Sequence, residues 1–465
     1  MSSLFASLQN AAGALNVFEN AIGVVQSNVT NASTPGYVNR TPALETDILG
    51  NVATAATENS RNQFAEQAVW QQNGLLGFAS AQADNLSGLQ SQFDVSGKSG
   101  IPGALSNLYT AFSSWSTTPD DATARNQVLT AAGQVVQAFN QAAANVQASV
   151  TQANQQISSS VDQINQLTSK IVAINTQIRN GGKDNPGLQT QLYNALQQLS
   201  NFSTVSVHME LDGTATVLMN EQVPLVIGAT QTALQLSYSS TAGSTAMPDA
   251  RITTADGQDV TSSAATGGQL GGLLQVRNET LPALIGNANQ QGSLNQLAQS
   301  IADRVNTLLT NGQTPSGTQG VPLFTYSSNA PTGIAGSLSV NPAITVSGLA
   351  AIQPGPPAVA NGVATELAGL GNSSNSADMI SGMNYTDFYS AIASNLGSQA
   401  TNASQTKDSQ TDLLNQAENA RSQASGISLD QQATQLLQFQ QAYAASSKLI
   451  SVIDQMTGDL MNMIQ

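Results

Sequence analysis

Apolar residues near the N-terminus alternate steps of four and three positions, which is the spacing of a heptad seam. The seam consists of Leu4, Leu8, Ala11, Leu15, Phe18, Ile22, Val25 and Val29. Glu19 is the only charged residue before Arg40, and further apolar residues lie off the seam. Such a helix requires neighbours on several sides. The pattern predicts a helix over residues 1–31 that packs inside an assembly.

The C-terminal segment has a similar pattern. Gly426 ends one predicted helix, and Ser428 can cap the next with Gln431 at its third position. Apolar residues then recur near steps of three and four: Leu429, Ala433, Leu436, Phe439, Tyr443, Ile450, Ile453, Met456, Leu460 and Met463. We therefore predict a terminal coiled-coil domain made of residues 1–60 and 427–465.

This predicted domain has a small apolar interface. Its seam includes Ala11, Gln440 and Ser447, and burial contributes only roughly 25 cal/mol per Å² of apolar surface. Ordering each residue costs about 1.5 kcal/mol. We expect the two terminal helices to order fully only when they pack against other copies of the same chain.

Thr34-Pro35-Gly36-Tyr37 follows the first helix. Proline and glycine at the two central positions predict a type II turn, which redirects the backbone sharply. Residues 38–60 are polar and mixed, and we interpret them as a linker or a short extended segment.

Residues 61–311 and 377–426 carry long apolar stripes, which predict a bundle of long helices. The longest stripe begins at Thr118-Pro119, with Thr118 as the cap, and ends at Gly181-Gly182. A helix of this length could exceed about 80 Å. Another helix is expected from Pro282 to Asn311. We interpret the glycine-rich stretch from Gly267 to Leu274 as a flexible turn.

The period changes to two after about residue 200, which predicts a small antiparallel sheet over about residues 202–262. Asp212-Gly213 is a hairpin-turn pair within it. Residues 312–376 are rich in Gly, Pro and Ser, and we interpret them as a small irregular insertion. The predicted fold is mainly α with a small β part, in an elongated multi-domain chain.

Composition narrows the possible functions. Only 9% of the residues are charged, against about 25% in a typical soluble domain, and an uncharged polar surface suits a polymer subunit or a secreted adhesin. The net charge of −15 argues against nucleic acid, because no counterions would be released. No apolar run is long enough to cross a membrane. The N-terminus lacks a secretory signal, so export would need another route.

The sequence contains one histidine and no cysteine. His208 shares a predicted strand face with Ser206 and Glu210, but neighbours two positions apart on one strand are usually just solvated. A phosphate-binding loop would need a glycine where Gln92 stands before Gly97-Lys98. We therefore predict no catalytic residue, no cofactor and no metal site. A secreted surface enzyme or adhesin remains a less favoured alternative.

Four stretches carry a resemblance to a known family. They are the N-terminal helix through Thr34-Pro35-Gly36-Tyr37, Pro119 to Arg125, Gly271 to Pro282, and Ser425 to Tyr443. The two ends resemble the axial proteins of the bacterial flagellum, and the two internal stretches resemble the hook-associated protein 1 family. The chain reads Asn28-Val29-Thr30-Asn31 where that family usually has Asn-Ile-Ala-Asn, and the resemblance fades over residues 312–376.

The resemblance implies a structural subunit of the flagellum at the junction between hook and filament, which seeds filament assembly. It implies a ring of about eleven identical copies, with hook protein below and a second junction protein and flagellin above. It also implies an export chaperone, export through the flagellar type III apparatus without a cleaved signal, and an extracellular location. A hook or rod axial protein is the alternative within the same class.

Overall fold

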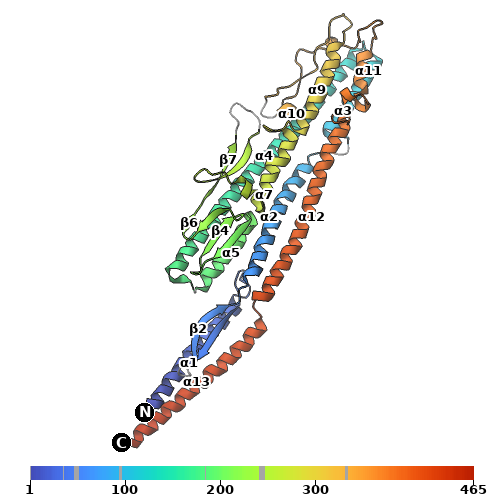
Figure 1. The fold of residues 1–465 in the computed structure, drawn as a ribbon. Helices are drawn as coiled ribbons and strands as arrows, with labels where there is room; N and C mark the ends of the chain where they lie inside the picture. The colour runs from blue at the N-terminus through green and yellow to red at the C-terminus, as the bar shows by residue number, and fades with distance from the viewer. Residues whose placement is uncertain are drawn as a thin grey trace.

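The computed structural model describes residues 2–34, 36–46, 52–93, 97–183, 185–239, 247–329 and 333–464. The molecule is elongated, with both chain ends at one tip (Figure 1). A narrow terminal rod leads from this tip to a wider body of helices and small sheets. The predicted fold class, mainly helical with small antiparallel sheets and paired long terminal helices, is confirmed.

The terminal rod consists of two antiparallel helices and a hairpin. The helices are α1 (Ser2–Thr30) and α13 (Leu429–Ile464), which lie side by side. The hairpin is formed by β1 (Arg40–Thr46) and β2 (Val52–Asn59), and it packs on α1. Arg40 is opposite Asn59 and Thr46 is opposite Val52. The segment that the sequence predicts as a linker or extended piece is therefore a paired hairpin.

The body is built around α4 (Ala122–Gln177), whose 56 residues span about 84 Å. This helix begins later than predicted, because Asp121 is its cap and accepts from the Thr123 N–H. Thr118 instead ends α3 (Gly100–Thr117), with its N–H donating to the Ser114 carbonyl. The sequence pattern did not predict α3.

Two long helices, α2 (Gln63–Gln90) and α12 (Tyr385–Ser425), pack against each other along the body. A π-helical turn, η1 (Ile178–Gly182), follows α4 and contains the left-handed Gly181, with φ +103°. The chain then returns as α5 (Pro186–Phe202), which packs on both α4 and α2.

Two small sheets cover one side of α4 (Figure 1). The first has the order β3-β4-β5-β6 and is antiparallel throughout; its strands are β3 (Val205–Met209), β4 (Ala215–Met219), β5 (Val223–Ile227) and β6 (Thr230–Gln231). The second is a separate pair of β7 (Leu234–Ser239) and β8 (Asp249–Thr254). Asn175 of α4 fixes the first sheet, since its side chain bonds the backbone of Ala215 and Gly228 at 2.8–3.0 Å.

The flexible turn predicted over Gly267 to Leu274 is wrong. After α6 (Thr261–Ala264), these residues form most of the buried helix α7 (Gly268–Gln275), which packs on α2. A side chain at Gly272 would place its Cβ 2.4 Å from the Phe78 carbonyl oxygen. Glycine is therefore required here for close helix packing and not for flexibility.

The helix expected from Pro282 to Asn311 is divided. After the π-helical turn η2 (Val276–Thr280), α8 (Leu281–Ile285) ends at Gly286, and α9 (Ser293–Asn311) begins after Gly292. Both glycines have φ above +80°, and a Cβ on Gly292 would contact the Gly286 nitrogen at 2.2 Å. The two glycines thus close a loop that no other residue pair would fit.

The described residues between 313 and 384 form only short elements. These are β9 (Phe324–Thr325), α10 (Gly333–Ser337), β10 (Ser339–Val340), α11 (Gly362–Gly369), and the 3-10 turns η3 (Val346–Gly348), η4 (Leu370–Asn372) and η5 (Ser376–Asp378). Leu323, Leu349 and Leu367 are nevertheless buried among residues of α3, α4 and α9. This segment forms part of the body's core.

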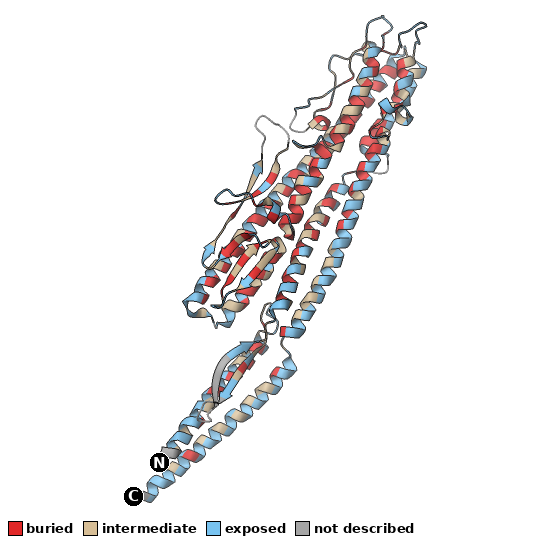
Figure 2. Cartoon of the chain, viewed as in Figure 1, coloured by how far each residue is buried: buried red, intermediate tan, exposed pale blue. Residues whose placement is uncertain are grey.

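The body has two apolar cores that share α4. Residues of α4 from Ala124 to Ala153 belong to the outer core, with α3, α9 and α12, and those from Ile157 to Ile174 belong to the inner core, with α5, α7 and the sheets. Neither core includes a described residue of the rod. Figure 2 shows the same contrast, with buried residues concentrated in the body and few in the rod.

Candidate assembly surface and the polar joint behind it

The predicted N-terminal seam lies between α13 and the hairpin. Val25 is buried, and Val29 is exposed. The remaining described seam positions are half-buried or, for Ala11, buried: Leu4, Leu8, Ala11, Leu15, Phe18 and Ile22. Val17 and Ala21, which lie off the predicted seam, are also buried. A second buried stripe arises because α1 contacts the hairpin as well as α13.

The predicted C-terminal seam is less enclosed. Of its members, Ile453 is buried, Leu436, Phe439 and Ile450 are half-buried, and Leu429, Tyr443 and Leu460 are exposed. Met456, Leu460 and Met463 of this predicted pattern continue at steps of three and four to Leu449 and Val452, and all five side chains are exposed. We call these five residues the open stripe. The sequence analysis left out Leu449 and Val452, although their spacing from Met456 is the signal that identifies them.

The predicted turn joins α1 to β1 within the rod and contacts the body. The Tyr37 N–H donates to the Thr34 carbonyl at 3.1 Å, and Gly36 has the positive φ, +73°, that a type II turn requires at its third residue. Pro35 lies outside the described residues. A side chain on Gly36 would place its Cβ 2.3 Å from Asn194 Oδ1 of α5. The glycine thus serves both the turn and the close contact with the body.

Polar side chains fill the interior where α1, β1 and α13 meet. Asn28 is fully buried, and its Nδ2 donates to Gln432 Oε1 and the Arg40 carbonyl at 2.8 Å and to Asn39 Oδ1 at 3.0 Å. Its Oδ1 accepts from the Tyr37 hydroxyl and the Arg40 N–H, both at 3.2 Å. Gln432 Nε2 donates to Asn39 Oδ1 at 3.2 Å. We call Asn28, Asn39 and Gln432 the amide hub.

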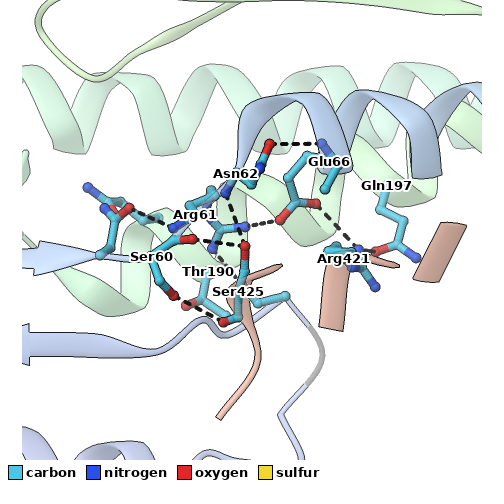
Figure 3. Close-up of polar contacts among 12 residues, drawn as sticks. Ser60, Arg61, Asn62, Glu66, Thr190, Gln197, Arg421 and Ser425 are labelled. Atoms are coloured by element: carbon cyan, nitrogen blue, oxygen red, sulfur yellow. Dashed lines mark hydrogen bonds and ion pairs between the residues drawn. The ribbon is translucent and has the colours of Figure 1, made fainter. Parts of the chain in front are cut away.

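The two points where the chain passes between rod and body are bonded to each other (Figure 3). Ser60 Oγ donates to the Ser425 carbonyl at 3.2 Å, and Ser425 Oγ donates to the Ser60 carbonyl at 2.9 Å. The Asn62 N–H donates to Ser425 Oγ at 3.0 Å, and the Asn39 N–H donates to the Ser425 carbonyl at 3.0 Å. Segments about 365 positions apart in sequence are therefore held together.

A buried charge cluster lies on the body side of these crossings (Figure 3). Glu66 is 2% exposed and accepts from Arg61 at 2.5 Å and from Arg421 at 3.4 Å. Arg61 also donates to the Gly36 carbonyl at 2.7 Å, and its guanidinium lies 3.7 Å from the centre of the Tyr193 ring. Burial lowers the pKa of Arg61, opposed mainly by the charge of Glu66. We call the hub, the serine crossings and this cluster the polar joint.

Sequence reasoning missed the polar joint, although Asn28 and Tyr37 belong to the motif that carries the resemblance. A single acidic residue, Glu66, on a buried helix face is the only local signal for the charge cluster. Its partner Arg421 lies 355 positions away, beyond any pattern of spacing.

The structure does not bring His208 and Glu210 into a catalytic arrangement. His208 is exposed on β3, and Glu210 instead accepts from the Thr216 hydroxyl at 3.0 Å. Within the described ranges, no three or more His, Asp or Glu residues are grouped so that they could hold a metal ion. Among the helices the structure describes, none is long and apolar enough to cross a membrane.

Comparison with known proteins agrees with this architecture. Residues 86–324 match the model of the flagellar hook-associated protein FlgK helical domain, and residues 419–463 match that of the flagellar basal body rod FlgEFG protein C-terminal region. Flagellar hook-associated protein 1 of Bacillus subtilis (strain 168) is 23% identical over 505 residues, with 99% of each chain covered. The flagellar hook junction protein FlgK from Burkholderia pseudomallei shares the fold, with a TM-score of 0.67 and 17% identity, over 78% of this chain and 100% of that one.

Long paired terminal helices and these two family matches define an axial protein of the bacterial flagellum. The chain belongs to the FlgK family of flagellar hook-associated proteins, the structural proteins of the hook–filament junction, which are not enzymes. The resemblance drawn from the sequence is confirmed. The C-terminal match alone is shared with rod proteins, and the match over residues 86–324 separates this family from them.

Proposed function

We propose that the chain forms a closed ring of about eleven copies between the flagellar hook and the filament, and that this ring seeds filament growth. Residues 1–60 and 427–465 form the inner tube of the ring, and the body forms its outer part. Hook protein contacts the ring from below, and a second junction protein and flagellin contact it from above. The family match and the terminal rod support this proposal.

The observation that carries the proposal is the location of the exposed apolar side chains. Nineteen large apolar residues are exposed among those described. Two of them lie on α1, which has 29 residues, and nine lie on α13, which has 36 residues. The two helices therefore carry more than half of the exposed large apolar side chains. Apolar patches of this kind indicate an interaction surface. Five of the nine form the open stripe, and a heptad-spaced stripe fits a neighbouring helix.

The proposed mechanism is mechanical. Covering an exposed Leu or Met side chain contributes about 1.5–3 kcal/mol, so a neighbouring copy that covers the open stripe stabilises a rod with a small core of its own. The rod assembles because it is incomplete, whereas the body is already folded when it arrives. The seam and the turn at Pro35, Gly36 and Tyr37 then act as positioning elements, and no cofactor takes part.

A chain with such a stripe needs protection before it assembles. We propose that an export chaperone covers α13 in the cell, and that the chain leaves through the flagellar type III apparatus to the extracellular flagellum. The same residues would then contact the chaperone first and the sibling copies later.

The test compares two kinds of substitution in cells. Replacing Leu449, Val452, Met456 and Leu460 by Gln should leave the purified chain folded but abolish its incorporation and filament growth, as should deletion of residues 430–465. Leu413→Gln removes an exposed apolar side chain from the body and serves as the control. Cells that carry this variant should swim normally. Normal motility of the deletion would overturn the proposal.

Because the region that matches over residues 419–463 is shared with rod proteins, a position in the hook or the rod is the alternative that a test of location must exclude. Labelled antibody on purified hook–basal bodies separates the two. Label at the outer hook end supports the junction, and label along the hook or rod supports the alternative.

A further inference from the structure

The apolar side chains of the terminal rod do not by themselves fix the axial alignment of α13 against α1. Two helices with a heptad seam can slide by one heptad, about 10 Å, and still bring apolar side chains together. Several enclosed positions carry small side chains, among them Ala11 and Ala21 of α1 and the half-buried Ala442 and Ser446 of α13. Small side chains form shallow contacts, which distinguish one alignment from another only weakly.

The amide hub responds differently to sliding. Asn28 is 0% exposed and Gln432 is 1% exposed, and at the observed alignment each has partners. If α13 moved by one heptad, the Gln432 amide would lose both Asn28 and Asn39. An unpaired buried amide costs about 1–3 kcal/mol, so the hub penalises every alignment except one.

Asn28 also binds the turn after α1 and the first residue of the hairpin, so both lie beside the same helical turn of α1. Its Oδ1 accepts from Tyr37, which the turn at Gly36 returns to the helix, and from Arg40 at the start of β1. Ser27 Oγ lies 3.1 Å from the Tyr37 hydroxyl, and Asn31 Nδ2 donates to the Ser27 carbonyl at 2.9 Å. The residues of the N-terminal motif are thus the parts of one hydrogen-bonded unit.

We propose that Asn28 and Gln432 are positioning residues that set the axial alignment of α13 against α1. The open stripe lies entirely on α13, and Phe5 with the rest of the tip of α1 lies at the same end of the rod. The alignment of the two helices therefore decides which surface a neighbouring copy meets. This inference rests on the proposed function for its importance, but the alignment itself is a property of the isolated chain.

The experiment measures alignment directly. The chain has no cysteine, so Asn10→Cys with Ala433→Cys, both at exposed positions, allows spin labels to be placed only on α1 and α13. Electron-spin distance measurement on the otherwise unchanged chain should give a single narrow distance. Asn28→Leu with Gln432→Leu should keep the helical content but add a second distance, shifted by about 10 Å.

Two further variants keep the test decisive. Gln432→Leu alone leaves the bonds of Asn28 to Tyr37 and Arg40 in place and should show the same second distance. Asn20→Leu with Gln438→Leu removes exposed amides from the same two helices and should keep the single distance. This control separates the loss of an amide from the loss of the hub.

A single unshifted distance in both hub variants would overturn the proposal, because apolar packing would then set the alignment. A broad, featureless distribution for Gln432→Leu would also overturn it, because the amide would then hold the helices together and not align them. Neither result depends on assembly. A chain that fails to enter the flagellum for other reasons would still show the shift.

Discussion

The body and the terminal rod have the same apolar periodicity in their helices, but the apolar positions are covered to different extents. In the body, apolar positions such as Phe139 and Ile157 are fully enclosed by other parts of the chain. In the rod, Leu449 is 52% exposed, and only one side of α13 faces α1. The comparison teaches that a heptad pattern predicts a helix and its apolar face, but not whether the chain itself covers that face.

The largest expected effect is on the free energy of unfolding, and it tests directly whether the body and the rod differ in how far they cover their apolar side chains. Phe139→Ala should lower the free energy of unfolding of the body by about 3–5 kcal/mol, because it removes a fully buried ring and leaves a cavity. Leu449→Ala should change it by less than about 0.5 kcal/mol, since its side chain is half exposed. Urea denaturation of the isolated chain, followed by circular dichroism, measures both. Equal effects would mean that the rod is as self-contained as the body.

The charge cluster tests how the two regions are joined. Glu66→Ala should destabilise the chain by about 3–5 kcal/mol, because Arg61 loses its carboxylate partner in a buried site. Asp84→Ala removes one member of an exposed pair with Lys407 and should cost only about 0–1 kcal/mol. Thermal unfolding of both variants provides the measurement. A small loss for Glu66→Ala would show that water replaces the cluster easily.

Two glycines sharpen the account of helix packing within the body. Gly272→Ala should destabilise by about 1–3 kcal/mol, because its Cβ would contact the backbone of α2. Gly133→Ala, in the interior of α4 where the added Cβ would meet no other part of the chain within 4 Å, should stabilise by about 0.5–1 kcal/mol. Denaturant midpoints compare the two. The same sign for both would contradict the packing described for α7.

The smallest expected effect depends on pH. Burial, together with the charge of Asp378, raises the pKa of Tyr385 from its ordinary 10.0 to about 12. The unfolded chain loses this proton above pH 10 while the folded body keeps it, so the free energy of unfolding is unaffected below pH 10 and falls between pH 10 and about 12. Tyr385→Phe should show a shallower decline in melting temperature over that range.

Tyr443→Phe removes an exposed phenol from the rod and serves as the control. Its melting temperature should decline with pH as in the parent chain. A decline for Tyr385→Phe that matches the parent would show that another group causes the alkaline loss.

Much of the fold could be predicted from local patterns. The stripe that defines α4, the cap at Ser428, where Gln431 N–H meets Ser428 Oγ at 3.4 Å, and the hairpin at Asp212-Gly213 all depend on residues a few positions apart. Such signals act before the chain is folded, and they survive in the final structure. The family could be inferred for the same reason, because its motifs are local.

The sequence predictions were wrong where tertiary packing overrides the conformation that a residue usually favours. The sequence pattern did not predict α3, because Pro102 and Gly103 are residues that usually interrupt a helix; they lie in its first turn, where a missing N–H is tolerated. Gly271 and Gly272 look flexible, but they allow α7 to approach its neighbours. The polar joint could not be predicted, because Ser60 with Ser425 and Glu66 with Arg421 meet only when the chain ends meet.

The uninterrupted course of α4 through both cores has one further consequence. Since a single helical backbone contributes to both cores, the body resists bending at its middle, and any tilt at the polar joint would move it as one stiff unit. With an arm of about 84 Å, a tilt of about 5° there would displace the outer end by about 7 Å. Small angular differences between neighbouring copies would thus be magnified into large differences of spacing at the circumference.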